Sequence, residues 1–397
     1  MPRTAYATAA LLTLSAILFV VAQISLRPHR LEGDEPYVLM TTISLLNGHF
    51  NVYPAYVARD FVALGLDELS WQVDPTDGYI PPEHGFTFPA IIAPVYAITG
   101  INGTRTFTLV ISALALPLLF FSCRRAGLSP IGSAMACLAL VCTAPWEFYA
   151  ARMLPEALAG TLTLAIVAAY TRFREAKRPG YAFAVGAMTV LLPIIYLKYS
   201  AIAVASGVLL VGDRKLRWNL ATYAMAPFAL AYVALWIYVY GYSIAVGTGA
   251  GPKDFNFATA VSRFWYAFID REHGIWVWAP GTILAIAGLI VWDRRTAAVQ
   301  AYLVAVFLLY AALYAAAMVT PGGPEPGRFL VAAAPAMIVL AAMALVRDGR
   351  FYLARTGVFA VFVLASGVIL GTSACAHHSS LPSDRYAARF PKLYYPD

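Results

Sequence analysis

A succession of apolar runs, most of them about 20 residues long, limits what this chain can fold into more than any other feature. A helix needs about 20 consecutive apolar residues to cross the hydrocarbon core of a bilayer. About eleven stretches approach this requirement: 6–26, 104–122, 129–145, 155–172, 181–197, 199–212, 217–240, 275–292, 298–319, 328–346 and 354–372. We therefore predict an all-α polytopic membrane bundle of about eleven transmembrane helices. Only 12% of the residues are charged, about half the share found in soluble domains, which excludes an ordinary soluble fold.

Three of the apolar segments need a separate interpretation. The first run lacks a clear small-residue cleavage site, so we expect a retained helix and no cleaved signal peptide. Lys198 separates two short runs, which are either two spans or one broken helix. The segment Phe86 to Gly100 is apolar but short and contains two prolines, so we expect it to lie at the interface or to re-enter the membrane.

The distribution of charge predicts the orientation of the bundle. With the N-terminus inside, the inner segments hold 15 of the 28 basic residues and 4 of the 21 acidic residues. The outer segments then hold 13 basic and 17 acidic residues, so the balance is +11 inside and −4 outside, which sums to +7. Lys and Arg concentrate in short cytoplasmic loops of membrane proteins. The basic excess is thus a topology signal and gives no reason to expect a nucleic-acid partner.

The longest segments between or after the runs all fall on the predicted outer side: 27–103, 241–274, 320–327 and 373–397. The inner loops are short and carry no phosphate-binding glycine pattern, so we expect no cytoplasmic nucleotide site. We treat 1–397 as a single transmembrane domain. Its first outward loop, 27–103, would carry interfacial helices, and 373–397 would form a polar outward tail. Function commonly resides in such segments outside the helices.

An acidic motif directly follows the first run. The chain reads Leu-Glu-Gly-Asp-Glu-Pro-Tyr over 31–37, which places three carboxylates beside the membrane. Acidic groups next to hydrocarbon are unfavourable, so they indicate a functional site. The alternative is that Asp34 or Glu35 only caps the following helix, Tyr37 to Leu46.

Two further motifs combine cations with outward helix ends. Arg152 and Glu156 lie at the joint between the third and fourth spans, in the sequence Arg-Met-Leu-Pro-Glu. Arg152 could hold a phosphate oxygen, because its guanidinium is always charged and binds oxyanions in a bidentate manner. The alternative is a structural Arg–Glu pair. Lys198, between Tyr196 and Tyr199 on the same side, would either bind a lipid phosphate or extend its ammonium to the interface.

Three outward loops carry further candidates. His84 lies in Pro-Glu-His-Gly-Phe, and Asp270 and His273 lie in Asp-Arg-Glu-His-Gly ahead of an aromatic-rich segment. Each could bind a hydroxyl or phosphate group, or could be an ordinary polar loop residue. Arg328 opens a span after a glycine-proline loop, where the helix N-terminus also favours anions. Its alternative role is an interface anchor.

These motifs, in this order and on one side, resemble those of the GT-C superfamily of membrane glycosyltransferases. The Gly-Asp-Glu-Pro sequence at 33–36 is similar to the catalytic motif of bacterial relatives of protein mannosyltransferases and aminoarabinose transferases. The turn at His84 departs from the pattern, since Phe86 and Thr87 replace a proline and a glycine. The resemblance spans residues 31 to 329 and does not specify the sugar.

The resemblance implies a GT-C fold and a set of roles. Asp34 would be the catalytic base, and the donor phosphate would bind to Arg152, Lys198 and Arg328. The expected substrate-binding residues are Glu35, His84, Glu156, Asp270 and His273.

The implied partners are a polyprenyl-phosphate sugar, either a pentose such as arabinofuranose or a hexose such as mannose, and an envelope glycan or glycolipid acceptor. The location would be a bacterial plasma membrane, with the site and the C-terminus on the outer face. No cofactor is required, although paired carboxylates at Asp34 and Glu35 would also suit a divalent cation. The competing hypotheses are a flippase for lipid-linked sugars and a non-catalytic scaffold.

Overall fold

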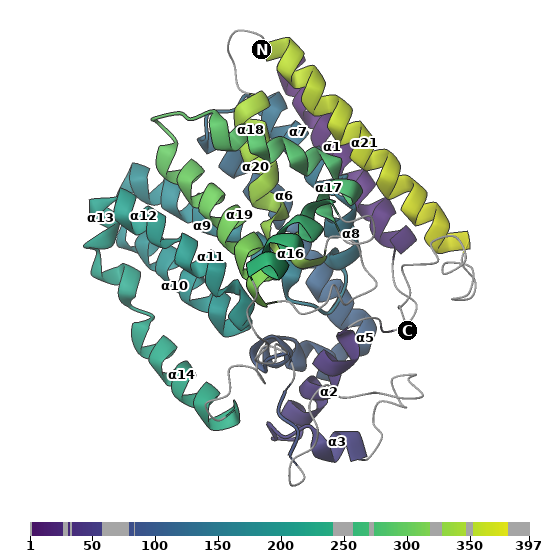
Figure 1. Cartoon of the computed structure of the whole chain (residues 1–397), viewed down its shortest axis with the longest axis vertical. Helices are drawn as coiled ribbons and strands as arrows, with labels where there is room; N and C mark the ends of the chain where they lie inside the picture. The colour runs from purple at the N-terminus through teal and green to yellow at the C-terminus, as the bar shows by residue number, and fades with distance from the viewer. Residues whose placement is uncertain are drawn as a thin grey trace.

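A computed structural model of the chain describes residues 2–26, 31, 34–57, 79–82, 84–240, 257–269, 274–317, 328–346 and 352–379. This part of the chain is helical and contains no β-strand. The all-α membrane bundle predicted from the apolar runs is thereby confirmed (Figure 1).

The first half of the described chain forms the first part of the bundle. Its helices are α1 (Pro2–Leu26), α2 (Glu35–Leu46), α3 (Tyr53–Val57), α5 (Thr87–Ala113), α6 (Ala115–Arg125), α7 (Pro130–Val141), α8 (Ala144–Ala150), α9 (Glu156–Ala176) and α10 (Pro179–Ile195).

The remaining helices complete the bundle. They are η1 (Leu197–Tyr199), α11 (Ser200–Ala205), α12 (Gly207–Gly212), α13 (Arg214–Arg217), η2 (Leu220–Tyr223), α14 (Ala226–Tyr240), α16 (Phe257–Ile269), α17 (Ile275–Trp278), η3 (Pro280–Leu284), α18 (Ala285–Ile290), α19 (Ala297–Ala317), η4 (Arg328–Ala333), α20 (Ala334–Leu345) and α21 (Tyr352–Ser379).

Fewer helical stretches are long and apolar enough to cross a membrane than the apolar runs suggest. Four stretches of the described chain meet this requirement, namely Thr4–Leu26, Thr87–Arg125, Leu220–Tyr240 and Tyr352–Thr372. The α7–α8 pair, bent by 69°, makes a fifth if it counts as one span. Other apolar helices are shorter, such as Pro179–Ile195 and Leu330–Leu345. Broken helices persist at membrane depth where neighbouring helices cover the interrupted backbone.

The two segments of uncertain path now have a structure. Gly100, at φ 65° and ψ −162°, interrupts α5, so Thr87 to Thr99 is a separate helical piece ahead of the next span. The positive φ explains the glycine, and the predicted place of 86–100 at the interface or within the membrane stays a prediction. On the two sides of Lys198, α10 and α11 pack against each other. They are therefore two antiparallel helices and not one broken span.

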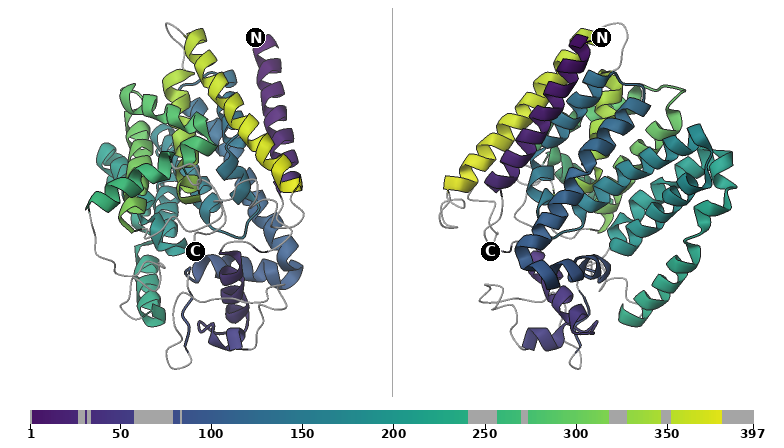
Figure 2. Two further views of the ribbon diagram at one scale, coloured as in Figure 1. Left: turned by 45° about the vertical axis from the view of Figure 1, so that its right-hand side comes forward. Right: turned by 180° about the vertical axis from the view of Figure 1, so that it is seen from behind.

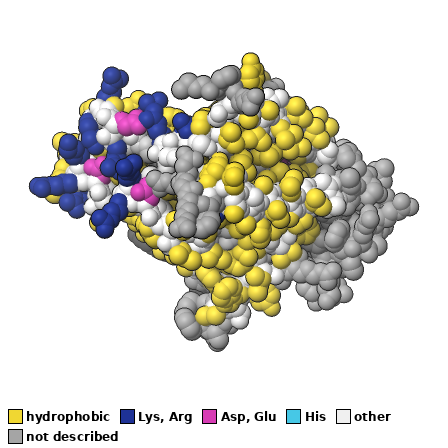
Figure 3. Space-filling model, turned by 90° about the horizontal axis from the view of Figure 1, so that it is seen from above, with side chains coloured by type: hydrophobic (Ala, Val, Ile, Leu, Met, Phe, Trp, Pro, Cys, Tyr) yellow, Lys and Arg dark blue, Asp and Glu magenta, His cyan; other side chains and the backbone are white. Residues whose placement is uncertain are grey.

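The two ends of the molecule differ in character. Helices α1 and α21 pack side by side along one edge of the bundle (Figures 1 and 2). The N-terminus lies at the top of the molecule and α13 at its left-hand edge in Figure 1, and Lys and Arg side chains gather on the left of the face seen in Figure 3. The short helices α2 and α3 lie at the opposite end (Figure 1). Basic side chains are thus concentrated on one part of this face, and the inside–outside assignment stays a prediction.

Helix α20 forms the centre of the bundle, and every residue from Ala334 to Ala344 is buried. Its small side chains let neighbouring helices approach closely, as is common where helices pack in membranes. A Cβ added to Gly288 of α18 would lie 2.7 Å from the carbonyl oxygen of Leu340 and 2.8 Å from its Cβ. This contact leaves no room for a larger residue.

We expect Gly288→Ala to lower the thermal midpoint of the detergent-solubilised protein, because overpacking costs about 1–3 kcal/mol. Gly207→Ala is the matched control, since a Cβ there meets nothing within 4 Å. Equal midpoints for the two variants would contradict the close approach of α18 and α20.

Candidate functional site

The carboxylate of Asp34 is accessible at the start of α2. Asp34 occupies the N-cap position, yet its side chain makes no capping hydrogen bond. Instead its Oδ2 lies 3.6 Å from Nε2 of His84, with 21% of the Asp34 side chain and 13% of the His84 side chain exposed. The capping alternative for Asp34 is therefore wrong. Pro36 is the second residue of α2, in the first turn, where a missing backbone N–H costs no helical hydrogen bond.

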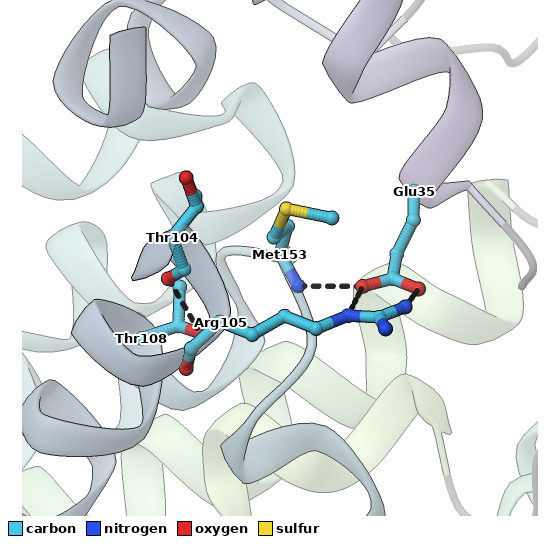
Figure 4. A network of polar contacts seen from close by, with 5 residues as sticks. All are labelled: Glu35, Thr104, Arg105, Thr108 and Met153. Atoms are coloured by element: carbon cyan, nitrogen blue, oxygen red, sulfur yellow. Dashed lines mark hydrogen bonds and ion pairs between the residues drawn. The ribbon is translucent and has the colours of Figure 1, made fainter. Parts of the chain in front are cut away.

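Glu35 has a different environment from its neighbour. Its carboxylate is fully buried and pairs with Arg105, whose Nη2 lies 2.7 Å from Oε2 and whose Nε donates to Oε1 at 3.2 Å (Figure 4). The backbone N–H of Met153 donates to the same Oε1 at 3.0 Å. The bidentate pair joins α2 to α5. The hydrogen bond from Met153 joins α2 to the loop between α8 and α9. Glu35 is thus placed to position Asp34, and its carboxylate is not presented to a substrate.

The loop between α8 and α9 brings the second predicted motif to the same place. Arg152 adjoins Met153 in this loop; it is 4% exposed, and its guanidinium carbon lies 5.6 Å from the ring centroid of Tyr149. Glu156 starts α9 and is 1% exposed. Glu156 forms an ion pair with Lys198, and the two alternatives for Arg152, a phosphate contact or a structural pair with Glu156, both stay predictions.

Lys198 is held at the edge of this cluster. Its Nζ lies 2.7 Å from Oε1 of Glu156 and within 4.7 and 5.3 Å of the ring centroids of Tyr196 and Tyr199. About a quarter of the side chain, 28%, remains exposed. An ammonium carries three N–H donors, and the contact with Glu156 uses one of them. The cation is therefore positioned, partly open, and able to bind an anion.

A continuous series of contacts links the predicted residues. Asp34 contacts His84, whose Nδ1 lies 3.4 Å from the hydroxyl of Tyr196. Tyr196 lies against Lys198, and Lys198 pairs with Glu156. Four segments far apart in the sequence thus meet at the end of the bundle where α2 lies. An accessible carboxylate beside fixed cations can accept a proton while a negative charge develops nearby.

Three predicted residues are not placed by these contacts. Asp270 and His273 lie outside the described residues. Arg328 is the first residue of η4, which packs against α8 and α9, the two helices that flank Arg152. The prediction for its side chain falls outside the described part of the chain.

Two important partners, Arg105 and Tyr196, were missed by the sequence-based assignments. Arg105 lies one residue inside the predicted span 104–122, and an arginine there should have signalled a buried carboxylate. Tyr196 had no comparable signal, because tyrosine is common at membrane interfaces. Among the described residues, no three His, Cys, Asp or Glu side chains gather as a metal site would require.

Comparison with known proteins identifies the fold. No protein-family model and no curated protein sequence matches the chain. The crystal structure of ArnT from Cupriavidus metallidurans bound to undecaprenyl phosphate matches it with a TM-score of 0.57 at 14% identity. The match covers 95% of this chain and 66% of that one, so this chain spans about two thirds of the length of ArnT. The predicted GT-C fold is thereby confirmed.

Proposed function

We propose that this protein is a multi-pass membrane glycosyltransferase that moves a sugar from a polyprenyl-phosphate donor to an acceptor hydroxyl. The observation that carries the proposal is the accessible carboxylate of Asp34. A series of contacts through His84 and Tyr196 connects this carboxylate to the fixed cation Lys198. The fold supports it, since a protein with this fold was crystallised with undecaprenyl phosphate.

The proposed reaction is a single inverting displacement. Asp34 accepts the proton of the acceptor hydroxyl, and the oxygen attacks the anomeric carbon of the donor. The bond from that carbon to the phosphate oxygen breaks, and the polyprenyl phosphate leaves with the electron pair. Lys198 and Arg152, with Arg328 as a third cation, stabilise the charge that develops on the phosphate.

The neighbouring residues have supporting roles in this proposal. His84 contacts the Asp34 carboxylate and is suited to orient it or to bind a hydroxyl. Glu156 holds the Lys198 ammonium in place. Glu35 and Arg105 fix the start of α2 without touching substrate. Asp270 and His273 remain proposed contacts to the sugar.

The site would face the outer side of a bacterial plasma membrane, with the basic end and the N-terminus in the cytoplasm. The donor lipid would enter laterally from the outer leaflet. The transferred sugar would be a pentose such as arabinofuranose or a hexose such as mannose, and the acceptor an envelope glycan or glycolipid. The Glu35 carboxylate is committed to Arg105, so we propose that transfer needs no divalent cation between Asp34 and Glu35.

The role of Lys198 leads to a specific expectation. Lys198→Met should raise KM for the donor about 10-fold or more, because a charge-assisted contact to phosphate contributes about 1.5–3 kcal/mol. Lys198→Arg, which keeps the charge, should retain most of the affinity. Steady-state kinetics over a range of donor concentrations measures both variants. An unchanged KM in Lys198→Met would remove Lys198 from the phosphate site.

Transfer itself is tested with purified protein in proteoliposomes that contain radiolabelled polyprenyl-phosphate mannose or arabinofuranose and an envelope extract as acceptor. Label appearing in a new glycan product supports the transferase. Label that crosses the bilayer without forming product would support a flippase. If the label neither forms product nor crosses the bilayer, the result would support a scaffold. Parallel reactions with EDTA or added Mg²⁺ test the metal proposal, which a requirement for Mg²⁺ would contradict.

A further inference from the structure

A cavity lies at the opposite, basic end of the molecule. A cavity of about 930 Å³ opens between α9, α12, α13 and α19. Its lining residues are Tyr170, Arg174, Lys177, Gly207, Val208, Val211, Gly212, Asp213, Arg214, Lys215, Arg294, Ala297, Ala298 and Ala301. The proposed transfer reaction uses none of them.

One part of the lining is strongly cationic. Arg174, Lys177, Arg214, Lys215 and Arg294 contribute five positive charges against one negative charge from a single carboxylate. Figure 3 shows Lys and Arg side chains gathered on one part of the molecular surface.

The single carboxylate, Asp213, is already engaged. It accepts hydrogen bonds from the backbone N–H groups of Lys215 and Leu216 and lies 4.0 Å from the Lys177 ammonium. The remaining excess of positive charge is suited to a phosphate group.

The opposite part of the lining is apolar. It is formed by Val208 and Val211 of α12 and by small residues of α19, namely Ala297, Ala298 and Ala301. Val211 is 77% exposed, so this wall opens toward the surroundings of the bundle and not into its core. A soluble anion would use the cations alone. A molecule with a phosphate and a hydrocarbon chain would use both parts.

The orientation of the bundle in the membrane does not by itself require these basic residues to lie around one cavity. Positive charge in any short cytoplasmic loop would set the topology, whereas here cations from three separate segments converge on one cavity beside an apolar wall. Basic pockets between membrane helices on the cytoplasmic side are suited to anionic lipid headgroups. We propose that this cavity binds an anionic glycerophospholipid of the cytoplasmic leaflet, with its phosphate at the cations and an acyl chain along α12 and α19.

The test is a titration of the detergent-purified protein with dioleoyl phosphatidylglycerol, followed by native mass spectrometry. Dioleoyl phosphatidylcholine, which has the same acyl chains and no net charge, is the lipid control, and inorganic phosphate is the soluble control. We expect phosphatidylglycerol to bind at least 10-fold more tightly than either control.

Two variants separate the headgroup from the chain. Arg214→Gln, Lys215→Gln and Arg294→Gln combined should weaken phosphatidylglycerol binding about 100-fold, at about 1 kcal/mol per basic residue. The matched triple change of Arg178, Arg217 and Arg295 to Gln removes the same charge outside the cavity lining and should leave binding within about threefold. Gly207→Leu keeps all the basic residues and fills the space beside the apolar part of the lining, because a Cβ added at Gly207 meets nothing within 4 Å. It should also reduce phosphatidylglycerol binding at least 10-fold.

Each alternative outcome overturns the proposal in a distinct way. Equal losses in the two triple variants would mean that general surface charge, and not the cavity, attracts the lipid. Equal affinity for inorganic phosphate, unaffected by Gly207→Leu, would identify a soluble anion site. Binding is measured directly, so the result does not depend on whether transferase activity is found.

Discussion

Replacing Asp34 by asparagine is expected to lower kcat for sugar transfer by about 1,000-fold, because a positioned general base contributes about 10²–10⁴-fold. Asparagine has nearly the same shape and cannot accept the acceptor proton. Asp34 makes no capping hydrogen bond to α2, so the change should leave the helix and the thermal midpoint intact. Initial rates of label transfer, measured beside the wild type, give the ratio.

Donor binding distinguishes loss of chemistry from loss of the site. The Asp34→Asn variant should bind undecaprenyl phosphate within about twofold of the wild type, because the phosphate contacts assigned to Arg152 and Lys198 are unchanged. Asp213→Asn, at the opposite end of the molecule, is the matched carboxylate control and should transfer at the wild-type rate. Substantial activity in Asp34→Asn would assign the proton transfer to another residue.

Breaking the Glu35–Arg105 pair is expected to have the largest effect on stability. Arg105 is 4% exposed and Glu35 is fully buried, so Arg105→Met leaves a carboxylate without its counter-charge. Removing one partner of a buried pair costs about 3–5 kcal/mol. The loss is measured by reversible denaturation in mixed micelles. Arg125→Met is the control, since the Arg125–Glu175 pair is 30% and 43% exposed and such surface pairs contribute about 0–1 kcal/mol.

A double variant then separates stability from positioning. Glu35→Gln with Arg105→Met removes both charges, and the Gln side-chain oxygen can still accept from the Met153 N–H. We expect most of the lost stability to return. Transfer should remain about 10- to 100-fold below the wild type, because small displacements of a catalytic group have effects of this size. Full activity in the stable double variant would show that the pair does not position Asp34.

The predictions from sequence succeeded where they depended on local patterns. Apolar length and the asymmetry of basic residues predicted a membrane bundle with two different ends. Three motifs were predicted to meet: the acid after the first span, the Arg-to-Glu turn and the lysine between two tyrosines. In the structure, contacts join Asp34 to Lys198 and Glu156.

The features that were not predicted depend on pairing across the chain. Glu35 and Arg105 are separated by 70 residues, and no local pattern distinguishes a carboxylate that binds substrate from one that is neutralised by a distant arginine. The positions at which helices are interrupted could not be predicted from the sequence either. Hydropathy places a segment in the membrane, but the breaks at Gly100 and between α7 and α8 depend on how neighbouring helices cover the exposed backbone.

Photolabelling shows whether a lipid phosphate binds beside Asp34. An undecaprenyl phosphate analogue with a diazirine close to the phosphate would be irradiated with the protein in nanodiscs, and the labelled peptides identified by mass spectrometry. The account predicts label on the segments that contain Arg152 to Glu156 and Tyr196 to Tyr199, displaced by unlabelled undecaprenyl phosphate. Displaceable label confined to the cavity lined by Arg214 and Arg294, at the other end of the molecule, would contradict it.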